Sequence, residues 1–330
     1  MNESPVIFGI GNPLIDIVIL VNDNDIISLG LNKGTMELVE LKQQKKILQY
    51  FKHSKLKFCP GGSAPNTIIA CAGLGISSML SGKIGADKFG DKYLKQVENY
   101  GALSSLIQAD SNSTGTSVIL VTPDGERTMV TNLGICRDYS YRDIDKDKLI
   151  QSSFLYFTGY MWDTISQKKA IKEAIEIAKK NKITIAFDVA DPFVVQRNKA
   201  EFLDMIKNDV DIVFANEVEL SLLFDSNDTH KSIDQLMEYV KSGGIKLGKK
   251  GSIVFEGEKK YKIKARSIKP KDTTGAGDMY AAGFLSSLSR FDDYKLAGEI
   301  GVALAEEIIQ IQGAQFDKNV IDKLASKMFQ

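Results

Sequence analysis

Apolar residues in the middle of the chain alternate between short continuous runs and helical spacing. Residues 154–157 and 183–189 are nearly continuous apolar runs, which are typical of buried strands. Between them, residues 168–180 carry apolar side chains at helical spacing, at positions 170, 171, 174, 175 and 178. The alternation continues with a helical pattern over 199–206, a strand pattern over 211–214 and a helix from Val218. This order predicts an α/β fold whose mostly parallel sheet has helices on both faces.

Polar residues or glycines follow several of these strands and should share one edge of the sheet. They are Gly159, Tyr160, Asp188, Asn216 and Gly248. Right-handed crossovers bring the carboxyl ends of parallel strands together, and open α/β sheets bind their ligands at that edge. The sequence therefore predicts a binding site there.

Two stretches depart from the alternation. Residues 16–40 and 114–133 have the composition of strands, and the second contains the turn Pro123-Asp124-Gly125. No linker-like segment, low-complexity segment or internal repeat divides the chain. A small β-rich unit beside the larger α/β unit is expected.

The segment Lys271-Asp272-Thr273-Thr274-Gly275-Ala276-Gly277-Asp278 precedes an apolar helical run over 279–288. Gly275 and Gly277 can adopt backbone angles closed to other residues, so that successive N–H groups converge on one anion at a helix start. Asp278 would lie in the first turn, where a carboxylate beside a phosphate site can take a proton from an attacking hydroxyl. The segment predicts phosphoryl transfer. The alternative is a glycine turn followed by a helix with an acidic start.

A second glycine cluster, Cys59-Pro60-Gly61-Gly62-Ser63-Ala64-Pro65-Asn66, also precedes an apolar helical run, over 67–74. Asn66 is the expected N-cap of that helix. Taken alone, the cluster also fits a tight turn. A third cluster, residues 9–16, lacks the glycine spacing of a dinucleotide-binding loop, and Pro13 with the β-branched run after it predicts a continuing strand. Binding of a nicotinamide cofactor is therefore excluded.

Composition and charge narrow the class of protein. The 330 residues are 43% hydrophobic and 25% charged, with 42 basic and 42 acidic side chains, so no overall field attracts nucleic acid or an anionic membrane. Cys59, Cys71 and Cys136 lack the spacing of metal ligands, and His53 and His230 have no partner histidine nearby. The first five residues contain no basic stretch, and no apolar run approaches 18 residues. A reduced, cytoplasmic protein without nucleic-acid or membrane partners is expected.

The two glycine clusters together resemble the two signatures of the ribokinase-like (PfkB) carbohydrate kinase family, and residues 11–17 resemble its adenosine kinase branch. Further matches occur in family order at 113–116, 123–128, 131–134, 156–160 and 216–219. The resemblance implies a three-layer αβα domain over 1–15, 41–112 and 134–330, and a small β-sheet lid over 16–40 and 113–133.

The resemblance also implies roles for individual residues. Asp278 is the general base, and the backbone of Thr274, Gly275, Ala276 and Gly277 forms the anion hole. The acceptor is held by Asn12, Asp16, Gly61, Gly62, Ser63 and Asn66, a mixture of donors and acceptors that suits vicinal hydroxyls. ATP is bound by Asn216, Glu219, Leu247, Gly248 and Gly251 together with Thr274, Gly275 and Gly277, and Glu219 orders Mg²⁺ through water. Arg127 is either a lid cation or a solvated arginine.

The acceptor is less closely defined. The apolar side chains of Leu14, Leu38, Leu133, Met161 and Trp162 suit an aromatic base better than a bare sugar. Met161 and Trp162 are expected to alternate along an extended segment, so that only one faces the ligand. The leading expectation is an ATP-dependent kinase that phosphorylates the 5'-hydroxyl of adenosine or a close nucleoside.

Two alternatives remain open from the sequence. The pair Thr273-Thr274 is more usual among sugar kinases, which makes a ribokinase- or fructokinase-like enzyme the second expectation. A catalytically silent nucleoside sensor is the third, and Asp278 argues against it. The protein would act on small molecules as a monomer or a homodimer.

Overall fold

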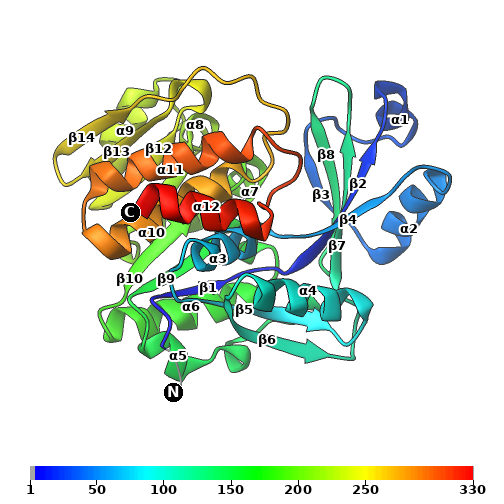
Figure 1. The fold of residues 1–330 in the computed structure, drawn as a ribbon, viewed down its shortest axis with the longest axis horizontal. Coiled ribbons are helices and arrows are strands. Elements are labelled where there is room, and N and C mark those ends of the chain that lie inside the picture. The colour runs from blue at the N-terminus through cyan, green and yellow to red at the C-terminus, as the bar shows by residue number, and fades with distance from the viewer. Residues whose placement is uncertain (1–3, 330) are drawn as a thin grey trace.

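The computed structural model describes residues 4–329, so residues 1–3 and 330, at the two ends of the predicted large domain, lie outside it. Within the described chain the strands form a nine-stranded and a five-stranded sheet. The large unit and the smaller lid lie side by side, the lid at the right of Figure 1. No helix among the described residues has the length and apolarity needed to span a membrane.

The large sheet is mostly parallel, as the apolar runs predict. Its strands, in spatial order, are β14 (Lys259–Ile263), β13 (Ser252–Glu256), β12 (Ser242–Lys246), β11 (Ile212–Asn216), β10 (Thr184–Asp188), β9 (Phe154–Thr158), β1 (Ile7–Ile10), β5 (Ser78–Gly85) and β6 (Leu103–Ala109). The pairs β12–β13 and β13–β14 are antiparallel, and the other neighbours are parallel. Because the parallel strands share a direction, β1, β9, β10, β11 and β12 all end at the edge beside the lid (Figure 1).

Helices cover both faces of this sheet, and each face has its own apolar core. One face carries α3 (Ser63–Gly73), α4 (Lys88–Asn99), α10 (Ala276–Phe291), α11 (Tyr294–Ile308) and α12 (Lys318–Phe329). The other carries α5 (Lys146–Ile150), α6 (Ile165–Lys180), α7 (Pro192–Asn208), α8 (Glu217–Phe224) and α9 (Thr229–Met237). The buried stripe of α6 contains Ala170, Ile171, Ala174, Ile175 and Ala178, the positions expected from its spacing.

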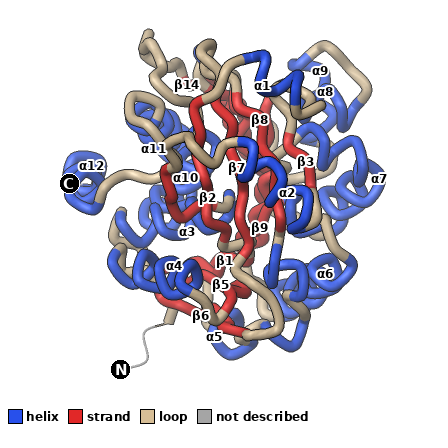
Figure 2. Tube along the Cα trace, turned by 90° about the vertical axis from the view of Figure 1, so that its right-hand side faces the viewer, coloured by secondary structure: helices blue, strands red, loops and turns tan. Residues whose placement is uncertain are grey.

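The lid sheet has the order β3 (Met36–Leu38), β8 (Arg127–Asn132), β7 (Gly115–Val121), β2 (Leu14–Leu20) and β4 (Lys57–Gly61). Figure 2 views the molecule from the lid side, with α1 (Asp23–Ser28) and α2 (Leu41–Tyr50) towards the reader. Side chains alternate across the strands: Val118 and Leu120 pack in the lid core, whereas Ser117 and Ile119 face the large unit across a cavity.

Residues 41–61 lie with the lid, although the sequence places them in the large domain. Strand β4 pairs with β2, and Ile47 and Phe51 pack in the lid core. The buried Gln44 side chain of α2 donates to the carbonyl oxygens of Thr116 and Val130 at 2.9 and 3.0 Å. An amphipathic helix does not reveal in its own sequence which sheet it covers, so the pattern alone could not assign α2.

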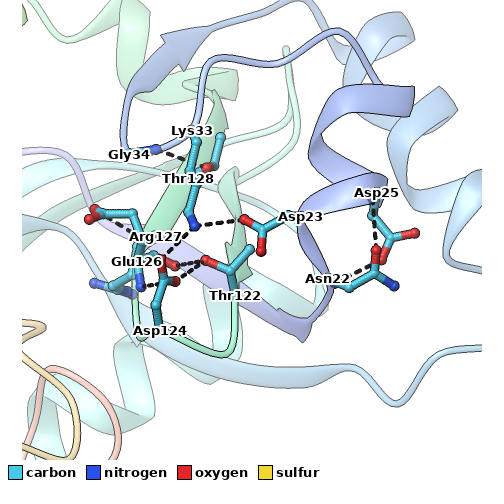
Figure 3. A network of polar contacts seen from close by, with 10 residues as sticks. All are labelled: Asn22, Asp23, Asp25, Lys33, Gly34, Thr122, Asp124, Glu126, Arg127 and Thr128. Atoms are coloured by element: carbon cyan, nitrogen blue, oxygen red, sulfur yellow. Dashed lines mark hydrogen bonds and ion pairs between the residues drawn. The ribbon is translucent and has the colours of Figure 1, made fainter.

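A network of polar contacts connects the chain segments at the outer end of the lid (Figure 3). The Lys33 ammonium lies 2.7 Å from the Asp23 carboxylate of α1 and 2.6 Å from the Asp124 carboxylate of the β7–β8 turn. The predicted turn at 123–125 is therefore present and anchored. Exposed ion pairs of this kind contribute little to stability, so the lid depends mainly on its small apolar core.

Candidate active site

A cavity of about 420 Å³ lies between the lid and the carboxyl edge of the large sheet. Residues from both predicted glycine clusters, from the strand ends and from the lid meet there. Those expected from the sequence are Asn12, Leu14, Asp16, Leu38, Gly62, Ser63, Asn66, Arg127, Leu133, Asn216, Glu219, Gly248, Thr274, Gly275, Ala276, Gly277 and Asp278. Segments more than 200 residues apart in the chain thus form one site.

The loop before α10 has the geometry of an anion site. Gly275 is the N-cap of α10 with φ of +73°, and an added Cβ would lie 2.8 Å from the backbone Cα of Ala314. Glycine is therefore required both for the backbone angle and for the close approach. The first N–H groups of a helix have no partner within the helix and carry a partial positive charge. The first-turn residues Ala276, Gly277 and Asp278 line the cavity.

Asp278 is joined to the second glycine cluster by two hydrogen bonds. The Ser63 hydroxyl donates to Oδ1 at 2.6 Å and the Asn66 amide donates to Oδ2 at 2.9 Å. Burial raises the pKa of Asp278 to about 6, against the effect of these two hydrogen bonds, while Asp188 adds to the rise and Lys246 opposes it. A carboxylate with a pKa near neutrality is ionised at pH 7 and still basic enough to accept a proton.

The helix after the second cluster begins earlier than expected. Its N-cap is Gly62, with φ of +98°, and its first residue is Ser63. Asn66 lies inside the helix, and its amide contacts Asp278 where a capping role was expected. The positive φ at Gly62 starts the helix four residues early, and an added Cβ there would lie 2.1 Å from the Asn12 carbonyl oxygen.

The Asp16 carboxylate projects from β2 towards the cavity. Burial raises the pKa of Asp16 to about 7, opposed by the Arg127 guanidinium and reinforced by Asp278. Gly61 does not line the cavity. It leaves room for Asp16, because an added Cβ would lie 2.3 Å from that carboxylate. The Arg127 Nε is buried without a hydrogen-bond partner among residues 4–329.

Two glutamines that the sequence did not single out hold polar side chains of the cavity wall. Gln167 Nε2 donates to Asn12 Oδ1 at 2.6 Å, which leaves the Asn12 amide N–H groups for a ligand. Gln315 Nε2 donates to Asn66 Oδ1 at 2.8 Å. The sequence contained one signal for Gln167. It lies three residues before Ala170 and four before Ile171, so it falls on the same buried stripe of α6.

Asn216 and Glu219 lie at the end of β11 and in the first turn of α8. Asn216 is the N-cap, and its backbone N–H and side-chain amide donate to the two Glu219 carboxylate oxygens at 2.8 and 2.6 Å. Burial raises the pKa of Glu219, against the effect of Lys246 and with a further contribution from Asp188. Asn216 and Glu219 thus form a buried capping pair that also lines the cavity.

These residues do not form a set of direct Mg²⁺ ligands. Both Glu219 oxygens already accept hydrogen bonds, and the described part of the chain contains no cluster of three potential metal-binding side chains. Octahedral Mg²⁺ usually keeps several waters and binds one or two carboxylates with the substrate phosphates. Direct coordination by Glu219 does not fit this arrangement.

Besides Gly61, four of the expected residues lie outside the cavity lining. Leu247 is buried in the large core, and Gly251, with φ of +96°, ends a short turn. Met161 and Trp162 belong to the 3₁₀ turn η3 (Gly159–Trp162), which replaces the expected extended segment. Both pack in the large core, so neither faces the cavity. Their neighbour Tyr160 lines it instead.

The pH dependence of activity should report on the cavity carboxylates. Asp278 and Asp16 have pKa values raised to about 6 and about 7, so both carboxylates become protonated as the pH falls through this range, and the roles expected for them require the ionised forms. We expect kcat/KM to fall as the pH is lowered through 7 and 6. In Asp16→Asn the part of this fall that occurs near pH 7 should be absent. The measurement is a pH–rate profile of the two proteins.

Unfolding would not explain such a loss. A carboxyl whose pKa is raised on folding binds its proton more tightly in the native state, so this contribution to stability grows as the pH falls through the raised value. Melting temperatures should therefore not drop between pH 8 and 6 on account of these groups. A parallel fall in melting temperature and kcat/KM would contradict the interpretation.

Comparison with known proteins gives consistent matches over almost the whole chain. Residues 27–320 match the pfkB family carbohydrate kinase profile. The solved structure of adenosine kinase from Sinorhizobium meliloti is 31% identical, with a TM-score of 0.92 over 98% of this chain and 99% of that one. A probable sugar kinase from Rhizobium etli CFN 42 is 29% identical, with a TM-score of 0.92 over 99% of each chain. Adenosine kinase from Schizosaccharomyces pombe is 27% identical over 339 residues, covering 94% of this chain and 96% of its own.

Proposed function

The chain belongs to the pfkB family of carbohydrate kinases, and we propose that within this family it transfers the γ-phosphoryl group of ATP to the 5'-hydroxyl of a nucleoside, with adenosine as the leading acceptor. The family assignment makes it a phosphotransferase with an alcohol acceptor. The observation that carries the proposal is the position of Asp278. It lies in the first turn of α10, directly after the glycine-rich segment 274–277 (the anion loop), and it also accepts hydrogen bonds from Ser63 and Asn66 of the proposed acceptor side.

This position explains how a neutral hydroxyl becomes a nucleophile. Asp278 accepts the hydroxyl proton while the first-turn N–H groups of α10 hold the charge of the transferring group. Phosphoryl transfer depends mainly on such positioning and electrostatic stabilisation. Closure of the lid would remove water and bring the Arg127 guanidinium, whose Nε has no partner among the described residues, towards the phosphates.

Asp16 and Asn12 are the proposed contacts of the ribose hydroxyls. The Asp16 carboxylate accepts hydrogen bonds, and the Asn12 amide, with its oxygen held by Gln167, presents donors. Leu14, Leu38 and Leu133 line the same cavity and provide an apolar surface for a base. Met161 and Trp162 are not part of this surface, since they are buried in the core.

ATP is the proposed phosphate donor, bound by the loop at Gly248, by Asn216 and by the anion loop. Gly248 adopts φ of +56° with open space around its Cα, which permits close approach of a ligand. When bound, Mg²⁺ would neutralise phosphate charge, and Asn216 and Glu219 would meet its hydration shell through water.

A coupled assay of ADP formation tests the acceptor directly. Adenosine, inosine, guanosine, ribose and fructose are compared under the same conditions by kcat/KM. Adenosine should exceed ribose by a large factor, since burial of a purine adds several kcal/mol at roughly 25 cal/mol per Å². Activity on ribose or fructose equal to that on adenosine would overturn the nucleoside proposal.

A sugar kinase is the second candidate. The Thr273-Thr274 pair favours it, as does the burial of Trp162 in the core, away from the cavity. The similarity to a probable sugar kinase adds weight. The proposed roles of Asp278 and of the anion loop are the same for either acceptor, so the acceptor comparison separates the two candidates without affecting the mechanism.

Replacement of Asp16 by Ala should weaken acceptor binding and leave ATP binding nearly unchanged. Loss of a hydrogen bond to a charged group costs about 1.5–3 kcal/mol, which corresponds to roughly a 10- to 150-fold weaker Kd. Calorimetry with adenosine and with ATP measures both. Asp23→Ala is the matched control, because Asp23 is a lid carboxylate that pairs with Lys33 away from the cavity. Equal losses for both ligands would make Asp16 structural.

A further inference from the structure

A buried lysine at the end of β12 has no role in the mechanism described above. The Lys246 ammonium lies 3.0 and 2.9 Å from the two carboxylate oxygens of Asp188, at the end of β10. The Lys246 side chain is 17% exposed and that of Asp188 is 3% exposed. Lys246 lines the cavity, whereas Asp188 does not. Of the two members of the ion pair, Lys246 therefore lies at the cavity surface and Asp188 lies behind it.

The ammonium group lies beside the anion loop. A Cβ added at Gly277 would be 3.4 Å from Lys246 Nζ, and Gly277 is in the first turn of α10. The N-terminus of a helix carries about half a positive charge, so an ammonium group there is repelled. Attraction to Asp188 alone does not explain why the ammonium group lies beside the start of α10. An anion between the ammonium group and the helix N-terminus would be attracted by both.

The charged groups around Lys246 favour its protonated form. Burial acts to lower its pKa, but Asp188 and Glu219 together raise it, and Asp278 contributes in the same direction. The lysine therefore stays protonated. An ammonium group has three N–H donors, and Asp188 accepts two of them. Among residues 4–329 no further hydrogen-bond acceptor is recorded for the ammonium group, which leaves the third donor for a ligand in the cavity.

We propose that Lys246 is a catalytic residue whose ammonium group contacts the γ-phosphoryl oxygens during transfer, and that Asp188 is its positioning residue. This inference rests on the proposed phosphoryl transfer from ATP. The bond between the γ-phosphorus and the bridging oxygen breaks, with its electron pair remaining on ADP, while the acceptor oxygen bonds to phosphorus and its proton passes to Asp278. Lys246 gives up no proton and stabilises the charge on the equatorial oxygens.

The stability of the fold does not by itself account for the ion pair of Lys246 and Asp188. Desolvation of two charges can cancel their attraction, and apolar side chains of similar volume are often as stabilising or more so. Removal of one member, by contrast, leaves an uncompensated buried charge. The test must therefore separate loss of the ammonium group from exposure of Asp188 as an unpaired charge.

Three variants make this separation: Lys246→Met, Lys246→Arg, and the double variant Lys246→Met with Asp188→Asn. The double variant leaves no unpaired charge behind. Lys179→Met is the matched control, because Lys179 of α6 also pairs with an aspartate, Asp209 at 2.6 Å, but does not line the cavity. Calorimetry measures binding of ADP and of the non-hydrolysable analogue AMP-PNP, which carries a third phosphate, without any acceptor.

We expect both Lys246→Met proteins to lose the preference for AMP-PNP over ADP and to lose roughly 10- to 100-fold in kcat, the scale of one charged hydrogen bond or one donor to the transition state. Lys246→Arg should recover part of both. The proposal would be overturned if the Lys246→Met proteins kept the same ratio of AMP-PNP to ADP affinity and the double variant regained kcat. The ion pair would then be structural. If the unaltered protein bound neither nucleotide, the proposed function itself would fail.

Discussion

Asp278→Asn should lower kcat by roughly 10²–10⁴-fold, the usual contribution of a general base, while the protein keeps its fold and its affinity for the acceptor. The substituted amide has the same shape and can satisfy the same partners. Its oxygen accepts from Asn66, and its N–H group donates to the Ser63 hydroxyl, which both donates and accepts. Only the capacity to take a proton is removed.

Steady-state kinetics and calorimetry with adenosine measure the two effects separately. Asp293→Asn is the matched control, since Asp293 caps the next helix, α11, through a bond from the Leu296 N–H at 2.9 Å. Asparagine caps a helix as well as aspartate does, so the control should retain full activity. Turnover close to that of the original protein in Asp278→Asn would refute the assignment of the base.

Local signals in the sequence predicted much of the site. Gly275 and Asp278 were expected at the start of a helix because the glycine-rich loop precedes an apolar helical run, and α10 begins at Ala276. A helix was predicted from Val218, and α8 begins at Glu217, with Asn216 and Glu219 as a reciprocal capping pair. In both cases the determining interactions lie within one turn of helix, so a short segment contains them completely.

Contacts between distant segments were not predictable in this way. Lys246 and Asp188 are 58 residues apart, and Gln315 and Asn66 are 249 apart. Nothing in the local pattern of either partner identifies the other. Strand order decides which side chains meet, because β10, β11 and β12 are neighbours in the sheet and therefore end side by side.

Met161 and Trp162 show why hydrophobic character does not identify a ligand contact. Both were expected near the base because large apolar side chains follow strand β9. The chain turns into η3, and the Trp162 ring packs between Phe157, Phe187 and Phe202 with ring centroids 5.5–6.5 Å apart. Core packing and ligand stacking bury the same kinds of side chain, and only the backbone path distinguishes them.

Gly275→Ala should lower kcat by roughly a hundredfold or more, the scale of losing one donor of an anion hole. An alanine Cβ would lie 2.8 Å from the Ala314 backbone, in a residue whose φ is +73°. The loop must shift to relieve this contact, and the first-turn N–H groups of α10 shift with it. Kinetics and the affinity for AMP-PNP should both reveal the displacement.

Gly257→Ala separates this effect from the cost of the backbone angle alone. Gly257 has φ of +56° with nothing within 4 Å of an added Cβ, and it lies in the turn between β13 and β14, away from the cavity. A left-handed angle at alanine costs about 1–2 kcal/mol, so both variants should melt at lower temperature, but Gly257→Ala should keep its kcat. If the two variants lost stability equally and both kept full activity, the N–H groups of α10 would not hold the transferring phosphoryl group.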